Sequence, residues 1–178
     1  MRYIALLRGV NVGGHVVKMD RLRALFAELG LANVRTYIQS GNVFFDTEET
    51  DRAALVERIE AHLRAALGYA VPVFLRTVAE LEAVVASDAF AHLTVTDDMR
   101  LCVMFLAEPL PGALAIPYRS PKGDVEVVRA TESEAYVVWR LINGRPPAAQ
   151  SFKGLGDRNT TRFFHTTAKI LEAARQGG

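Results

Sequence analysis

The first 77 residues alternate between apolar runs and apolar positions that are spaced three and four residues apart. Residues 2–7 form a short apolar run closed by Arg8-Gly9, which predicts a buried strand. Residues 19–29 repeat leucine and phenylalanine at the spacing of one helical face, and Gly30 follows as an expected helix end. The chain is therefore predicted to begin with a strand and an amphipathic helix.

The next elements complete a known supersecondary order. Two β-rich runs separated by Ser40-Gly41 predict a hairpin over residues 34–46 with a two-residue turn. A second amphipathic helix is predicted over residues 51–67, and a fourth strand over residues 71–75. The order strand, helix, strand, strand, helix, strand is the split βαβ pattern of the ferredoxin-like fold.

The second part of the chain predicts a different set of elements. Thr77 and Glu80 have the spacing of a capping box, which marks the start of a third helix. A buried strand, a proline-marked loop, a hairpin and a final helix are predicted to follow at 99–106, 109–123, 124–141 and 160–175. No repeat of matching residues relates this part of the sequence to the first.

Composition and length narrow the fold class. The chain has 178 residues, of which 50% are hydrophobic and 23% charged, a balance that excludes disordered, collagen-like and coiled-coil proteins. We expect an α+β protein in which a ferredoxin-like split βαβ half at 1–77 packs on a second, smaller α+β half at 78–178. Because neither half is large, we expect a shared interface, and a cleft there is the default ligand site.

The charge balance excludes one class of protein. Lysine and arginine number 21 against 20 aspartate and glutamate residues, so the net charge of +1 argues against the strongly basic field of a duplex-DNA binder but allows a local patch. Most of the basic residues are arginine, which suits bidentate contacts with carboxylate or phosphate, although genomic base composition produces the same bias.

The cysteine and histidine residues predict neither a disulfide nor a metal site. Cys102 is the single cysteine and lies in an apolar run, which predicts a core thiol and a cytoplasmic location. No segment is long and apolar enough for a membrane helix, and the four histidines lack the spacing of metal ligands. The sequence also lacks a GxSxG nucleophile elbow, so neither an enzyme activity nor a cofactor can be assigned.

The most informative segment is the glycine-bearing loop between the first strand and the first helix. Backbone N–H groups at Gly13 and Gly14, together with the helix N-terminus, can bind an anion, with Arg8 and Lys18 supplying charge and Asn11 orienting the ligand. The spacing GxxxGG matches neither the dinucleotide fingerprint nor the P-loop. In the alternative interpretation, the glycines only provide positive φ in a tight connection.

Polar side chains also gather at the predicted hairpin turn. Gln39, Ser40 and Asn42 are candidate ligand contacts, although serine and asparagine are ordinary turn formers. Three aromatic residues on the neighbouring strands have two interpretations, as bases of a stacking surface for RNA or as buried core: Tyr3, Phe44 and Phe45.

A third candidate segment lies near the C-terminus. Lys153, Thr161 and Arg162 combine two cations and a hydroxyl group just before and within the first turn of the predicted final helix. A helix start of this kind can bind an anion. The alternative interpretation is a solvated capping segment, because this stretch is rich in residues that cap helices.

Several of these stretches resemble a known family, the domain of unknown function 1697. The resemblance rests on ALLRGVNVGG at 5–14, the Lys18-Met19 helix entry, RTYIQSGNVFF at 35–45 and the late Thr-Thr-Arg. It implies an α+β protein with ferredoxin-like character, found mainly in bacteria and without an established activity. The late motif of that family continues with Asn-Trp, whereas this chain has Phe163-Phe164, so the asparagine amide is missing here.

The sequence leads to one favoured function and two alternatives. We expect a cytoplasmic protein that binds a small anionic, phosphate- or nucleotide-like ligand in a cleft between the two halves. The alternatives are an RNA or single-stranded nucleic-acid binding module and a protein-interaction domain, and the oligomeric state is left open. The expected ligand contacts are Arg8, Asn11, Gly13, Gly14, Lys18, Gln39, Ser40, Asn42, Lys153, Thr161 and Arg162.

Overall fold

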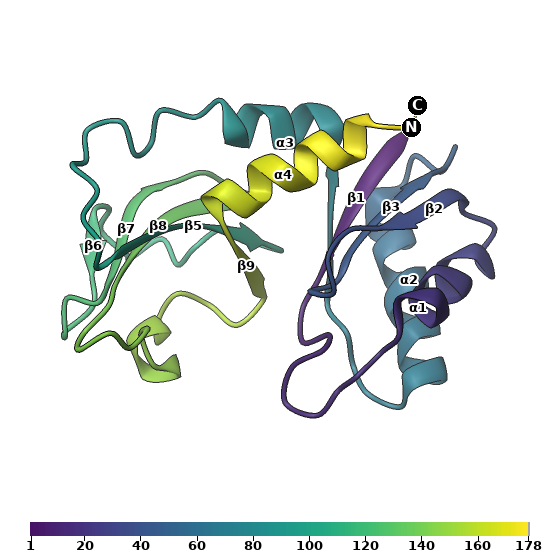
Figure 1. The fold of residues 1–178 in the computed structure, drawn as a ribbon, viewed down its shortest axis with the longest axis horizontal. Coiled ribbons are helices and arrows are strands. Elements are labelled where there is room, and N and C mark those ends of the chain that lie inside the picture. Colours follow the sequence, from purple (N-terminus) through teal and green to yellow (C-terminus); the bar gives the residue numbers. More distant parts are fainter. Residues whose placement is uncertain (178) are drawn as a thin grey trace. The chain divides into compact units, whose positions relative to one another are not determined.

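The chain folds into two compact units, each with one antiparallel sheet (Figure 1). A computed structural model describes residues 1–177; unit 1 comprises residues 1–83 with the C-terminal residues from 169 onward, and unit 2 comprises Val84–Ala168. The two sheets and four α-helices found within residues 1–177 confirm the predicted α+β class. The bounds of the two units fall within helices α3 (Val78–Val85) and α4 (Phe164–Arg175), so each of these helices contributes residues to both units. The domain division predicted at 77/78 stays a prediction.

Unit 1 has the element order of the split βαβ pattern. Its sheet order is β2-β3-β1-β4, and all neighbouring strands are antiparallel. The elements are β1 (Arg2–Leu7), α1 (Met19–Ala27), β2 (Ala32–Thr36), β3 (Asn42–Asp46), α2 (Arg52–Leu67) and β4 (Val73–Thr77).

Helices α1 and α2 pack on one face of this sheet. Their apolar positions at helical spacing are fully buried there, which removes their surface from water and stabilises the unit. The side chain of Asp51 caps α2 by accepting a hydrogen bond from the Ala54 N–H at 3.0 Å, and Gly68 ends the helix at φ 82°. The buried helix residues are Leu22, Leu25, Phe26, Leu55, Ile59 and Leu63.

The C-terminal turn of α4 lies against the other face of the same sheet. The Arg2 guanidinium donates to the Ala174 carbonyl at 3.1 Å, and the Arg35 guanidinium donates to the Ala173 carbonyl at 3.2 Å. Arg35 also lies over the ring of Phe44, 5.2 Å from its centroid. Both faces of the sheet are therefore covered, and the aromatic rings of Tyr3, Phe44 and Phe45 are buried.

The predicted two-residue hairpin turn is wrong. Strand β2 ends at Thr36, the Tyr37 N–H donates to the Asn42 carbonyl at 3.0 Å, and the connection spans residues 37–41. The physical reason is the side chain of Asn42, which donates to the Tyr37 carbonyl at 3.0 Å and so stabilises a wider turn. Ile38 takes φ 51° in this turn, a conformation that β-branched residues rarely adopt.

Unit 2 contains a five-stranded antiparallel sheet in the order β6-β7-β8-β5-β9. The predicted buried strand, the hairpin and the capping box of α3 are all present. The proline-marked loop includes one short strand, β6. The elements are β5 (Met99–Leu106), β6 (Tyr118–Arg119), β7 (Val125–Ala130), β8 (Glu134–Arg140), the short 3-10 helix η1 (Ala149–Phe152) and β9 (Asn159–Phe163).

The start of the predicted final helix is also wrong. Residues 159–163 form β9, which pairs with β5 so that Thr161 lies opposite Met104, and α4 begins only at Phe164. Buried and more exposed side chains alternate along this segment, as they do in a strand. Thr160 and Arg162 point into the unit, whereas Phe163 is exposed. Thr161 and Arg162 therefore lie on an edge strand and not at a helix N-terminus.

Candidate functional site

Three loops meet at one end of the sheet of unit 1. The Leu7 N–H donates to the Gly41 carbonyl at 2.8 Å, and the Arg8 N–H donates to the Pro72 carbonyl at 3.0 Å. The Asn11 side-chain amide donates to the Gln39 carbonyl at 2.5 Å. The loop between β1 and α1, purple in Figure 1, is thus joined to the β2–β3 turn and to the loop that precedes β4. We call this region the loop end of unit 1.

Asn11 holds the β1–α1 loop in its shape. Its N–H donates to the His15 carbonyl at 2.7 Å, and its Oδ1 accepts from the Val17 N–H at 2.8 Å. The residue has φ 59°, which asparagine tolerates better than most side chains. Because both ends of its amide are engaged, Asn11 acts on any ligand through the loop that it stabilises.

The two adjacent glycines expose their backbone at the tip of this loop. Gly13 and Gly14 have φ values of 57° and 86°. A Cβ atom at either position would meet no heavy atom within 4 Å. Neither N–H group donates a hydrogen bond to any residue from 1 to 177. Two successive N–H donors therefore face solvent in a loop of fixed shape, the kind of arrangement in which backbone amides bind anions.

Two cationic side chains flank these donors along the chain. Arg8 and Lys18 are both exposed, and Lys18 occupies the N-cap of α1, where its carbonyl accepts from the Leu22 N–H at 3.0 Å. Asp20 in the first turn of α1 pairs with Arg23, so its carboxylate is partly neutralised by that guanidinium. The charges of Arg8 and Lys18 make the loop a donor-rich, positively charged surface.

An aromatic contact at the loop end was not predicted from the sequence. The rings of His15 and Tyr69 stack with centroids 3.9 Å apart and an interplanar angle of 15°. Tyr69 directly follows the glycine that ends α2, but no local pattern links it to a histidine 54 positions earlier. The stack arises from the topology, which brings the loop before β4 next to the β1–α1 loop.

Of the predicted turn residues, Asn42 is not available to a ligand. It is fully buried, and its amide donates to the Tyr37 carbonyl and to the Ser40 hydroxyl, the latter at 3.1 Å. The expected contact between Asn42 and a ligand is therefore replaced by a structural role in the turn. Gln39 and Ser40 are exposed at the same turn.

The three predicted contacts near the C-terminus belong to unit 2. Lys153 is exposed at the end of η1, and Thr161 is half-buried on β9. Arg162 is buried, its guanidinium donates to the Thr160 hydroxyl at 2.9 Å, and burial lowers its pKa to about 10. Its burial and its bond to Thr160 make Arg162 part of the interior of unit 2. The expected cleft between the two halves stays a prediction.

The described residues contain little that points to covalent or metal chemistry. Burial raises the pKa of the Cys102 thiol to about 12, so the thiol stays protonated at neutral pH. Across residues 1–177, histidine, cysteine and acidic side chains form no group of three or more suited to a metal ion. Within the same range, no helix has the length and apolar character needed to cross a membrane.

Comparison with known proteins places the chain in a family. A solved structure with a similar fold is that of the conserved bacterial protein SP0830 from Streptococcus pneumoniae, which is 22% identical, with a TM-score of 0.68 over 98% of each chain. No curated protein matches this chain. The family model described as "Protein of unknown function (DUF1697)" matches residues 1–136, so the late Thr-Thr-Arg lies beyond the matched part. With more than half of its length matched, the chain belongs to the DUF1697 family.

Proposed function

We propose that this protein binds a small phosphate-bearing ligand at the loop end of unit 1. The observation that carries the proposal is the pair of exposed, successive N–H donors at Gly13 and Gly14, on a loop flanked by Arg8 and Lys18. Backbone donors and guanidinium groups bind phosphate oxygens through charge-assisted hydrogen bonds.

The shape of the loop supports this proposal. Asn11 ties the loop to its own backbone and to Gln39, and the Leu7 N–H is bonded to the neighbouring turn. A ligand therefore meets donors that are already in place, which lowers the entropic cost of binding. The exposed side chains of Gln39 and Ser40 add polar groups beside the donors.

We also propose that Lys153 and Thr161 of unit 2 offer a cation and a hydroxyl to an anionic ligand. Arg162 supports β9 from inside unit 2. We further propose a cytoplasmic protein, which agrees with a single cysteine that is buried and protonated.

The test is a titration of the full chain with inorganic phosphate and pyrophosphate, followed by the backbone amide NMR signals. We expect the signals of Gly13 and Gly14 to move most. The double variant Arg8→Gln/Lys18→Gln should bind about ten-fold more weakly, since each exposed charge contributes up to about 1 kcal/mol. Arg58→Gln, which removes an exposed arginine from α2, is the matched control and should bind like the unchanged chain. Unmoved glycine signals, or equal affinity in the double variant, would refute the proposal.

A row of aromatic rings in unit 2 favours a second candidate function, the binding of single-stranded nucleic acid. Phe163 stacks on His165 with centroids 5.7 Å apart and meets Trp139 edge to face at 5.6 Å, and Trp139 meets Phe152 at 5.9 Å. Phe163 and His165 are exposed, whereas the aromatic residues expected for this role, in unit 1, are buried. Exposed rings of this kind stack on bases.

Salt dependence tests this second candidate. For single strands the logarithm of affinity should fall with the logarithm of salt concentration with a slope of about −0.7 per phosphate neutralised. Phe163→Ala should weaken binding of an oligonucleotide by about 1–3 kcal/mol, the usual contribution of one base-stacking ring. An affinity that does not change with salt would reject this function.

A further inference from the structure

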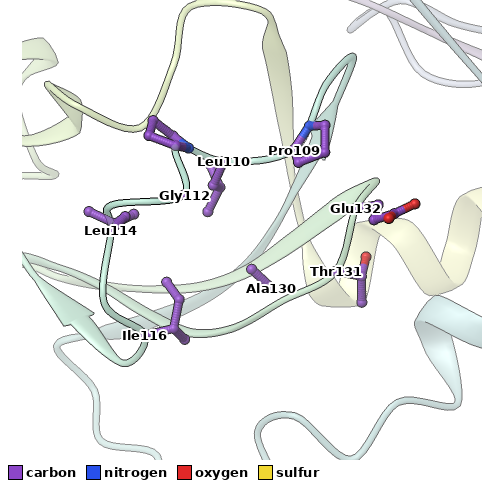
Figure 2. A pocket seen from close by; sticks show the side chains of 9 residues that line it. Pro109, Leu110, Gly112, Leu114, Ile116, Ala130, Thr131 and Glu132 are labelled. Carbon is purple, nitrogen blue, oxygen red and sulfur yellow. The ribbon is translucent and has the colours of Figure 1, made fainter.

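Unit 2 contains a cavity of about 380 Å³ between the proline-marked loop and the β7–β8 turn. Figure 2 shows the aliphatic side chains of Leu110, Leu114 and Ile116 on one side, and Thr131 and Glu132 on the other. Its volume lies within the range of small-molecule sites, but it is an open hollow, so a bound ligand would stay partly exposed to solvent. All of its lining residues belong to unit 2, so it is separate from the loop end of unit 1.

The apolar wall of this cavity is anchored to the core. Leu110 and Leu114 are partly buried and pack against the apolar residues beneath the sheet of unit 2. Pro109 and Pro111 fix their own φ angles, and the Leu114 N–H donates to the Pro111 carbonyl at 3.0 Å. The loop is thereby held in a defined shape, so its aliphatic side chains form a wall that exists before any ligand binds.

The polar side of the cavity offers one free charged group. The Thr131 hydroxyl accepts from the Glu134 N–H at 3.0 Å and donates to the Glu134 carboxylate at 3.2 Å, so it is engaged. Glu132 is exposed and forms no hydrogen bond or ion pair with any residue from 1 to 177. None of the described residues that line the cavity is a lysine, arginine or histidine. Its electrostatic preference is therefore for a cation.

We propose that this cavity binds a small organic cation, an amine carried on an apolar body. The apolar body would contact Leu110, Leu114 and Ile116, which removes its surface from water. The ammonium group would face the Glu132 carboxylate and complete its missing ion pair. An anion of the same shape would bring like charges together at the rim, so the site should discriminate by the sign of the ligand charge.

The experiment compares three probes of one shape on the full chain: phenethylamine, 2-phenylethanol and phenylacetate. Backbone amide NMR signals should move at residues 110–116 and 130–132 with phenethylamine, with dissociation constants in the millimolar range. Phenylacetate should bind about three-fold more weakly or worse, the factor expected when an exposed charge pair is lost.

Three variants test the roles of the residues. Glu132→Gln should lower the affinity for phenethylamine by about three-fold and leave the affinity for 2-phenylethanol unchanged. This result separates the contribution of charge from that of apolar contact. Ile116→Ser, at a position 38% exposed and therefore tolerant of change, should weaken all three probes. Asp97→Asn removes an exposed carboxylate of unit 2 that does not line the cavity, and should leave every affinity unchanged.

Each other result would overturn the inference. Signals that do not move, or that move outside the lining residues, would show that the cavity does not bind this class of ligand. Equal affinity for phenethylamine and phenylacetate, or an unchanged affinity in Glu132→Gln, would remove the role of the carboxylate. A short peptide with an arginine beside a leucine serves as a further probe. If it binds more than ten-fold better than phenethylamine, the ligand is a protein partner and not a small amine.

Discussion

The loop end of unit 1 and the proline-marked loop of unit 2 are built by different forces. Hydrogen bonds that involve Asn11, Gly41 and Asn42 hold the loop end, and they leave amide donors and cations on its surface. Aliphatic side chains anchored to the core hold the second loop, and they leave an apolar wall beside one carboxylate. A loop fixed by polar bonds thus presents the groups of the proposed anion site, and a loop fixed by packing presents the apolar surface of the proposed cation site.

The largest expected effect tests the polar construction of the loop end. Gly41→Ala should lower the free energy of unfolding by about 2–4 kcal/mol, because Gly41 has φ 84° and a Cβ would lie 3.0 Å from the Leu7 Cβ. Gly14→Ala has a similar φ but open space, so it should cost only about 1 kcal/mol. Urea denaturation measures both values, and equal losses in the two variants would show that the turn is not tightly packed.

The next effect concerns the buried asparagine of the β2–β3 turn. Asn42→Ala should destabilise the chain by about 1–3 kcal/mol, because Asn42 is fully buried and the half-buried Tyr37 carbonyl loses a donor. Gln39→Ala at the exposed end of the same turn is the control and should stay within about 0.5 kcal/mol of the unchanged chain. A neutral Asn42→Ala would contradict the polar construction of this region.

A pH series compares a paired carboxylate of unit 1 with the unpaired one of unit 2. The hydrogen bond from Arg2 holds the pKa of Asp46 below its usual value. This stabilisation is complete above the pKa of aspartate in the unfolded chain, about 3.9, and is lost as the pH falls through the lower value of the folded chain.

Asp46→Asn should therefore cost about 1 kcal/mol at pH 7. The difference should begin to shrink as the pH falls below about 4 and disappear below the lower pKa of Asp46 in the folded chain. Glu132→Gln should change the free energy of unfolding by less than about 0.5 kcal/mol across the same range. Urea denaturation at pH 7, 5 and 3 provides the measurement. A loss for Asp46→Asn that is the same at every pH would show that charge is not its cause.

The smallest effect has the opposite sign and tests the loop of unit 2. Gly112 has no positive φ, and a Cβ there would meet no heavy atom within 4 Å. Gly112→Ala should therefore stabilise the chain by up to about 1 kcal/mol, because alanine reduces the freedom of the unfolded chain. A clear loss of thermal stability in this variant would mean that the loop depends on backbone freedom after all.

Elements with a single hydrophobic period could be predicted from the sequence. Strand β1 and helix α2 differ from their predicted bounds by at most one residue at each end, because an unbroken apolar run or a helical spacing has one structural solution. The helix start predicted near residue 160 was wrong because the hydroxyl and amide side chains of residues 159–163 also suit helix capping. Only the pairing with β5 shows that this segment is a strand.

Less of the candidate site could be predicted, because its groups come from distant segments. The glycine loop and its flanking cations are local in the sequence and could be named there. The contact of His15 with Tyr69 and the burial of Asn42 depend on how three loops meet, which no local spacing encodes. The cavity beside Glu132 likewise combines a loop and a turn that are about 20 residues apart, and the free carboxylate is visible only once its neighbours are in place.

The bonds from Arg2 to the end of α4 have a consequence for how the chain matures on the ribosome. Arg2 precedes by 172 and 175 residues the two carbonyls that it contacts, those of Ala174 and Gly177. One apolar face of the first sheet therefore stays uncovered on the ribosome until residues 169–177 have been synthesised. We expect nascent chains of this protein to bind holding chaperones until those residues emerge.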